Sequence, residues 1–415
     1  MKFLIRVAII SVGLLAASVP GQTVVAKPDP TPSSPVSSSQ REMALAAMLE
    51  GQRFAWVSGR TRSQAIMASN AGLAKAAFQR AIDIDPTLDE AYAAIAELAI
   101  AVPPGDINVG LDFAGMAIMI DKDNIGAHRI IGRLSTFKSR LNNGSFDPKV
   151  GLDAIAAWKE VTRLDPRNAE GWAFLAALYD QMKMPDERID ALRKWVASAQ
   201  PTEIRFFRQI MGSGEDLMPE SASFKLGSAL IMVGKMNEAV EVLSLVVADR
   251  PNDALAIESL SQALTGADAK SSAVAIQSLQ QASYVNPKNL LLSILLAKAQ
   301  ARSGKFGDAI LGLGKKAKAL SALDPVGTAS LEVAAGDLFA NAGQISDAVE
   351  AYEKALETRG IGNETLVPAD MREFAVSVFG KMIDTYRAAN RTADATSTIQ
   401  RARRLLGRDD LFANQ

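Results

Sequence analysis

Prolines divide this sequence into a series of similar segments, and their placement restricts the fold more than any other feature. Six of them lie at the ends of similar segments, at Asp85-Pro86, Asp165-Pro166, Gln200-Pro201, Arg250-Pro251, Asn286-Pro287 and Asp324-Pro325. A proline inside a helix costs about 3 kcal/mol, because it lacks an amide hydrogen and its ring clashes with the preceding turn. The prolines therefore mark helix ends, and the alanine- and leucine-rich stretches between them predict a series of helices from Arg41 onward.

Small and large side chains recur at fixed spacings within these segments. In residues 170–201, Trp172, Leu175, Ala176 and Tyr179 lie three, one and three positions apart. This spacing resembles the first half of the tetratricopeptide repeat signature, W-x2-L-[G/A]-x2-Y, whose period is about 34 residues. Related patterns occupy residues 220–253, 329–362 and 376–409.

The resemblance implies an all-α fold: an α-solenoid, coiled as a right-handed superhelix, of about nine helix–turn–helix repeats. Small residues are expected where the two helices of a repeat approach most closely, since larger side chains do not fit there. The residues assigned to these close approaches are Ala176, Gly227, Ala239, Ala297, Ala309, Gly336, Ala348 and Ala395. The pattern is weakest in the first repeat, where Gly59-Arg60-Thr61-Arg62 interrupts the expected first helix.

Changes in composition divide the chain into five segments. They are a signal peptide at 1–26, a Pro/Ser-rich disordered linker at 27–41, an N-terminal repeat array at 42–211, an irregular bend at 212–219 and a C-terminal repeat array at 220–410. The bend is predicted because Gly212-Ser213-Gly214 follows a short helical stretch and the surrounding residues fit the repeat poorly.

The first 26 residues have the features of a secretory signal. Lys2 and Arg6 precede an uncharged apolar run of 13 residues, Val7–Val19. The small residues that follow allow cleavage after Ala26. The run is shorter than the roughly 20 residues that a membrane-spanning helix needs. This favours a cleaved signal over an uncleaved anchor, so we expect an exported protein, periplasmic or extracellular, whose only membrane contact is this segment if it stays uncleaved.

Composition argues against most catalytic and cofactor chemistry. The chain of 415 residues contains no cysteine and one histidine, His128, which excludes thiolate nucleophiles, thiolate metal sites and histidine triads. His128 occupies a slot that the repeat fills with a large packing residue. Formal net charge is −1, with no basic excess for a nucleic-acid partner. We therefore expect a non-catalytic protein without cofactor or metal.

A glycine-rich segment around Lys315 superficially resembles a phosphate-binding loop. The full motif needs a glycine five residues before the Gly-Lys pair and a serine or threonine after the lysine. Those positions hold Ala309 and Lys316, and the segment lies within an expected helix. The sequence therefore does not favour phosphate binding here.

The resemblance implies a ligand groove on the concave face, which the first helix of each repeat lines. The slots that the pattern directs into this groove hold Arg129, Arg133, Phe137, Glu170, Asp180, Gln181, Phe224, Ile231, Met232, Asp337, Asn341, Asp384 and Arg387. Arg129 and Arg133 lie one helical turn apart, so both guanidinium groups can meet one carboxylate. The alternative is an ordinary solvated face. The slots do not match the lysine–asparagine clamp of chaperone-binding members of the family.

Two functions follow from this architecture. The first is an exported scaffold that binds a protein or peptide partner on its concave face. The second is an envelope- or polysaccharide-associated assembly or export protein, by analogy with similar solenoids. A glycan-active enzyme is the third and weakest alternative, because any two suitably spaced carboxylates satisfy its minimum requirement.

Overall fold

The computed structural model describes residues 35–101, 105–140, 145–198, 204–212, 215–362 and 365–412. The expected signal peptide and most of the expected linker lie outside these residues. The described part is built from helices, with one isolated bridge between Arg140 and Phe146. None of its helices combines the length and the apolar character needed to cross a bilayer.

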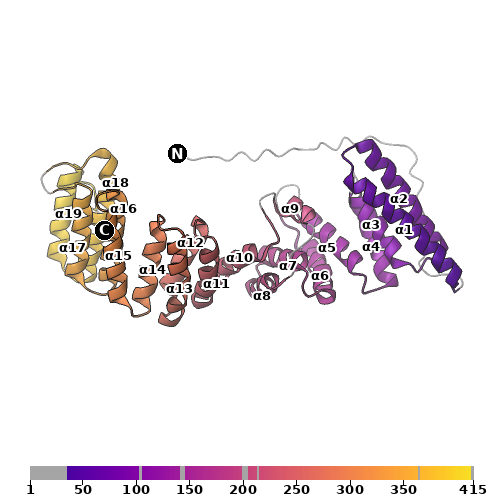
Figure 1. The fold of residues 1–415 in the computed structure, drawn as a ribbon, viewed down its shortest axis with the longest axis horizontal. Coiled ribbons are helices and arrows are strands. Elements are labelled where there is room, and N and C mark those ends of the chain that lie inside the picture. The colour runs from indigo at the N-terminus through magenta and orange to yellow at the C-terminus, as the bar shows by residue number, and fades with distance from the viewer. Residues whose placement is uncertain are drawn as a thin grey trace. The chain divides into compact units, whose positions relative to one another are not determined.

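The chain forms two compact units that divide between Ile131 and Gly132. In the first unit, α1 to α4 pack as successive antiparallel neighbours, indigo to purple in Figure 1. Their bounds are α1 Ser38–Arg60, α2 Gln64–Ile84, α3 Asp89–Ala101 and α4 Ile107–Ile120. Helix α5 (Ile125–Ser139) contains the point of division.

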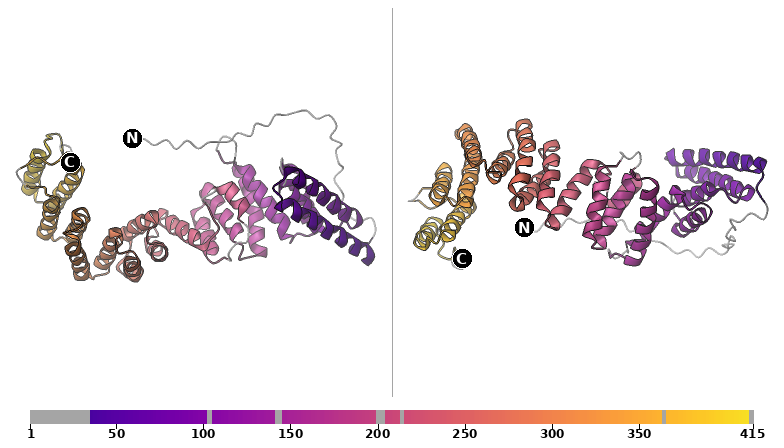
Figure 2. Two further views of the ribbon diagram at one scale, coloured as in Figure 1. Left: turned by 45° about the horizontal axis from the view of Figure 1, so that its top comes forward. Right: turned by 90° about the horizontal axis from the view of Figure 1, so that it is seen from below.

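The second unit continues the same alternation of helices, and Figures 1 and 2 show them stacked in chain order. The bounds are α6 Pro148–Leu164, α7 Ala169–Gln181, α8 Pro185–Val196, α9 Arg205–Met211, α10 Pro219–Met232, α11 Met236–Asp249, α12 Ala254–Gly266, α13 Ala269–Val285, α14 Leu290–Arg302, α15 Phe306–Leu320, α16 Pro325–Asn341, α17 Ile345–Thr358, a 3₁₀ turn η1 Ala369–Met371, α18 Arg372–Ala388 and α19 Thr392–Leu406. In the described residues the helices form nine pairs, with α9 between the fourth and fifth. The predicted all-α solenoid of about nine tetratricopeptide-like repeats is confirmed.

The helices end where the proline phrases predict. Helix α2 ends at Ile84 before Asp85-Pro86, and α6 ends at Leu164 before Asp165-Pro166. The next helix is then capped by a side chain; for example, Asn168 accepts a hydrogen bond from the Gly171 amide at 2.9 Å. Such caps satisfy amides that have no partner inside the helix, so each turn both stops one helix and starts the next.

Small residues lie at the helix crossings, as expected. Ala176, Ala239, Ala309 and Ala348 are all buried. A Cβ atom placed on Gly227 would lie 2.5 Å from the side chain of Leu243 on the partner helix. Close approach of the paired helices therefore depends on the absence of side-chain atoms at these positions.

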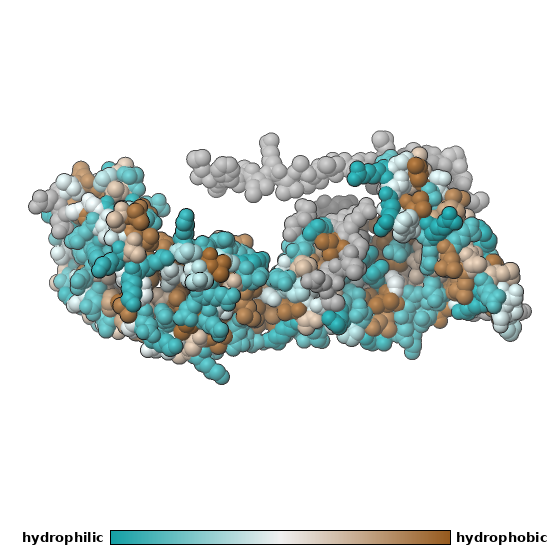
Figure 3. Space-filling view, in the orientation of Figure 1, coloured by the Kyte–Doolittle hydropathy of each residue, from teal (hydrophilic) through white to brown (hydrophobic). Residues whose placement is uncertain are grey.

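On the face that Figure 3 presents, hydrophobic residues are dispersed among hydrophilic ones.

Three expected boundaries differ from the structure. The linker was expected to reach residue 41, but α1 begins at Ser38, because Ser37 and Gln40 form a reciprocal capping box. The Gly59–Arg62 segment does not interrupt the first helix. It is the end of α1 and the turn into α2.

The third difference concerns the bend expected at 212–219. The compact units divide at residue 131 instead, and one hydrophobic core runs without a break from Ala154 to Ala299. Leu217 is buried in this core, and its carbonyl accepts a hydrogen bond from the Trp195 indole at 2.9 Å. Gly212 ends α9, and Leu217 beyond it packs into the same core.

Candidate functional site

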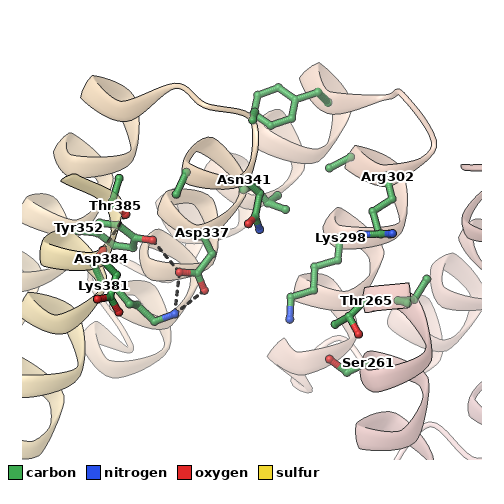
Figure 4. A pocket seen from close by; sticks show the side chains of 16 residues that line it. Ser261, Thr265, Lys298, Arg302, Asp337, Asn341, Tyr352, Lys381, Asp384 and Thr385 are labelled. Atoms are coloured by element: carbon green, nitrogen blue, oxygen red, sulfur yellow. Dashed lines mark hydrogen bonds and ion pairs between the residues drawn. The ribbon is translucent and has the colours of Figure 1, made fainter. Parts of the chain in front are cut away.

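The C-terminal repeats of the second unit surround a cavity of about 780 Å³. Its walls come from the first helices of four successive repeats, α12, α14, α16 and α18, and Figure 4 shows their side chains converging on it. Leu264, Phe306 and Leu338 supply apolar surface. We call this cavity the C-terminal groove.

Polar side chains enter the C-terminal groove at a repeated spacing. Each of the four helices contributes two lining residues four positions apart, which places both on one face of the helix. These pairs are Ser261 and Thr265 on α12, Lys298 and Arg302 on α14, Asp337 and Asn341 on α16, and Lys381 and Thr385 on α18. The groove thus presents a ladder of hydrogen-bonding groups along successive repeats.

Several of these groups have no partner within the chain. Lys298, Asn341 and Asp384 make no hydrogen bond or ion pair with any described residue. Arg302 donates one N–H to the carbonyl of Ala267 at 2.5 Å, which holds its guanidinium at the rim of the groove. Lys298 and Arg302 make one wall cationic, and the opposite wall offers a carboxylate and an amide. Donors and acceptors are therefore available to a ligand on both walls.

The acidic wall is fixed by a hydrogen-bonded network. Lys381 contacts both carboxylate oxygens of Asp337, at 2.7 and 2.9 Å, and thereby joins α18 to α16. The Tyr352 hydroxyl donates to the same carboxylate at 2.8 Å. Burial raises the pKa of the Tyr352 phenol, and the charge of Asp337 raises it further. The phenol therefore stays protonated, and the network holds Asp337 in one orientation.

A second large cavity, of about 880 Å³, lies along α6, α7 and α8. Three successive helices line this second cavity, whereas the first helices of four successive repeats contribute to the C-terminal groove, and two of the second cavity's polar residues are held by contacts within the chain. The Trp172 indole donates to the carbonyl of Pro166 at 2.8 Å, Lys194 lies over the Trp172 ring, and the same lysine pairs with Asp190 at 3.1 Å. We therefore regard the C-terminal groove as the better candidate for a binding site.

The structure brings three of the predicted groove residues together: Asp337, Asn341 and Asp384 all line the C-terminal groove. Arg387, on the same helix as Asp384, is half-buried and does not line it. Phe224 and Ile231 are half-buried and pack against the hydrophobic core. Met232 is exposed, and its sulfur lies 3.7 Å from Arg188.

The remaining predicted residues belong to the earlier repeats. Arg133 and Glu170 are both buried and form a two-fold hydrogen-bonded ion pair, at 2.7 and 2.9 Å. This corrects the expectation that they face a ligand, since each satisfies the other. Arg129 lies 3.7 Å from Glu97, so the two arginines meet different carboxylates of the chain itself.

Phe137 and Gln181 are exposed, and Asp180 pairs with Arg188 at 2.8 Å. His128, assigned to packing, is buried, and its Nε2 lies 2.8 Å from the carbonyl oxygen of Lys122.

Six residues of the polar ladder were absent from the prediction: Ser261, Thr265, Lys298, Arg302, Lys381 and Thr385. The sequence does contain a pattern that identifies one of these residues. Asp337 directly follows the close-approach glycine Gly336, and Lys298 directly follows Ala297, which has the same role. Applying that offset to the seventh repeat would have identified Lys298 on the cationic wall.

Comparisons with known proteins find no match to any protein-family model and no match among curated proteins. Solved structures do match in part. The crystal structure of YrrB, a TPR protein with an unusual peptide-binding site, is 17% identical and covers 52% of this chain and 95% of its own, with a TM-score of 0.33. A tetratricopeptide repeat protein from Parabacteroides merdae is 13% identical over 67% of this chain and 93% of its own, with a TM-score of 0.32.

A third solved structure covers more of the chain. The human IFIT1 dimer with m7Gppp-AAAA is 13% identical over 89% of this chain and 96% of its own, with a TM-score of 0.26. Similarity at this level carries no argument about a ligand. The fold class follows from the helix pairs described above.

Proposed function

We propose that the protein is a non-catalytic binding protein whose C-terminal groove holds an extended polypeptide segment of a protein partner. The observation that carries the proposal is the ladder of polar side chains on four successive helices, several of which have no partner among the described residues. An extended backbone exposes a donor and an acceptor at every residue, so it can use such a ladder along its length.

The charge of the groove favours an acidic group in the segment where it crosses α14. Lys298 and Arg302 are one helical turn apart on the cationic wall, and no carboxylate in the described part of the chain pairs with Lys298. A hydrogen bond between charged groups contributes about 1.5–3 kcal/mol, roughly ten- to a hundredfold in affinity. Lys298 is therefore the residue whose charge should matter most for binding.

The groove is a poorer match for a polysaccharide. Sugar rings usually stack on exposed aromatic faces, and the groove has two aromatic lining residues. Tyr352 is buried, and Phe306 packs edge-on against Phe339 with ring centroids 5.6 Å apart. This arrangement favours a peptide over a glycan, and therefore the scaffold over an envelope or polysaccharide role.

Peptides selected from a random library against the full-length chain provide the test. Lys298→Glu should weaken their binding at least about tenfold, because it reverses a charge in the groove. Lys270→Glu is the matched control, since Lys270 is exposed on α13 and does not line the groove. Equal losses in the two variants would indicate general attraction to the basic surface. Unchanged affinity in Lys298→Glu would place the binding site elsewhere.

We also propose that the partner is met outside the cytoplasm, on the basis of the basic, apolar and small-residue pattern of residues 1–26. Expression with the native amino terminus in a bacterial host is expected to yield a periplasmic protein that begins at Lys27. Mass spectrometry of the fractionated protein measures this directly. A cytoplasmic protein that retains Met1 would contradict export.

A further inference from the structure

One block of the second unit, flanked directly by Asp268 and Asp324, has an excess of positive charge. Residues 269–323, which include α13, α14 and α15, contain eight basic side chains and one acidic side chain, Asp308, although the whole chain has a net charge of −1. The basic residues are Lys270, Lys288, Lys298, Arg302, Lys305, Lys315, Lys316 and Lys318. None of the eight makes an ion pair with a described residue. Like charges gathered in this way repel one another, so the block favours a polyanionic partner.

Exposed apolar side chains lie at the same block, along one edge of the repeats. Tyr284 is 88% exposed and Leu323 is 83% exposed, and Val285 and Leu291 are exposed as well. They flank two turns that connect successive repeats, after α13 and after α15. Most exposed residues at comparable turns of a soluble repeat protein are polar, so a group of four is unusual.

Two contacts place these two turns next to each other. The Lys316 ammonium donates to the carbonyl of Pro287 at 2.6 Å, which joins α15 to the turn after α13. A Cβ atom on Gly327 would lie 2.6 Å from Leu290, which joins the start of α16 to the same turn. The exposed side chains of Tyr284, Val285, Leu291 and Leu323 therefore lie at two neighbouring turns, together with the exposed side chains of Lys288 and Lys318. We call these six residues the basic-apolar edge.

We infer that the basic-apolar edge docks on the surface of a lipid bilayer that contains anionic phospholipid. The lysines match the negative headgroups, and the leucine, valine and tyrosine side chains match the boundary between headgroups and acyl chains. A water-soluble polyanion, such as a nucleic acid or an acidic polysaccharide, would satisfy the lysines but would leave Leu323 and Val285 in water. The combination of the two side-chain types is what selects a membrane.

The absence of cysteine from the chain allows a site-specific test with the full-length protein. Leu323→Cys is labelled with an environment-sensitive fluorophore and mixed with vesicles of phosphatidylcholine, with or without 30% phosphatidylglycerol. We expect a blue shift with the anionic vesicles that is reversed by high salt, because salt screens the lysines. Leu245→Cys is the matched control: Leu245 is 68% exposed on α11, outside the basic block, and should show no shift.

Two further variants separate the lysines from the apolar residues. Neutralising Lys288, Lys315 and Lys318 with glutamine should lower the partition coefficient about a hundredfold, at about fivefold for each lysine near the surface. Val285→Ser with Leu323→Ser should also lower it at least tenfold. Residues 1–34 are common to all variants, so their contribution to vesicle binding cancels in the comparison. Thermal melts verify that each variant is folded.

Other occupants of the edge give different results. Loss of binding in the lysine variant alone, without loss in the serine variant, would indicate a polyanion in water and overturn the inference. A blue shift at residue 323 that grows with protein concentration and needs no vesicles would indicate a second copy of the chain. Its acidic helices α16 and α17 have the complementary charge. Vesicle binding without any shift at residue 323 would place the membrane contact elsewhere. Failure of this inference leaves the proposed peptide groove untouched, because none of the edge residues lines it.

Discussion

Replacing Glu170 by alanine is expected to lower the free energy of unfolding by about 3–5 kcal/mol, the usual cost of removing one member of a buried ion pair. The side chains of Arg133 and Glu170 are only 9% and 8% exposed, and the pair joins α5 to α7 through two hydrogen bonds. Without Glu170, the Arg133 guanidinium stays buried but loses the carboxylate that holds it through two hydrogen bonds. Urea unfolding of the wild-type and variant chains measures the difference.

Two controls identify the cause of that loss. Arg133→Met combined with Glu170→Met removes both charges and keeps apolar volume, so it should recover most of the lost stability. Glu238→Ala breaks an ion pair with Arg193 in which both side chains are about half exposed, and it should cost less than about 1 kcal/mol. A double variant as unstable as Glu170→Ala would mean that shape, and not the unpaired charge, accounts for the effect.

The fold could be predicted because its determinants are local in sequence. Proline and the polar residue before it stop a helix whatever the surroundings, and the alanines and glycines recur at a spacing that only paired helices explain. The predicted bend at 212–219 shows the limit of that reasoning. Gly212 does end α9, but whether the chain then leaves the core depends on Trp195 and Leu217, which meet only in three dimensions.

The candidate site was partly predictable for the same reason. Arg133 and Asp337 occupy the same slot, directly after a close-approach glycine, and both were assigned to the groove. Asp337 lines the C-terminal groove, whereas Arg133 is buried against a carboxylate 37 residues away. The slot fixes the direction in which a side chain points. The residue opposite the slot determines whether that side chain is available to a bound ligand or forms an ion pair within the chain. That residue belongs to a neighbouring repeat and is not identified by the slot.

The second large effect tests the steric basis of the repeats. Gly336→Trp should lower the free energy of unfolding by at least about 3 kcal/mol, the upper part of the usual range for an overpacked site. A Cβ atom at this position would lie 2.5 Å from the Tyr352 ring, far inside contact distance. Tyr352 is 2% exposed and its hydroxyl is bound to Asp337, so moving its ring aside would break that hydrogen bond.

Gly312→Trp provides the matched control for that substitution. Gly312 also lies inside a helix, α15, but no atom lies within 4 Å of a Cβ placed on it. The two substitutions change helix propensity equally, so the difference between them isolates the clash. Gly312→Trp should therefore alter stability by less than about 0.5 kcal/mol. Because Tyr352 also orients Asp337, the Gly336 variant should disturb the C-terminal groove as well as the helix pair. Equal stability of the two variants would mean that the glycine does not hold α16 and α17 together, and the assignment of the small residues to helix crossings would then fail.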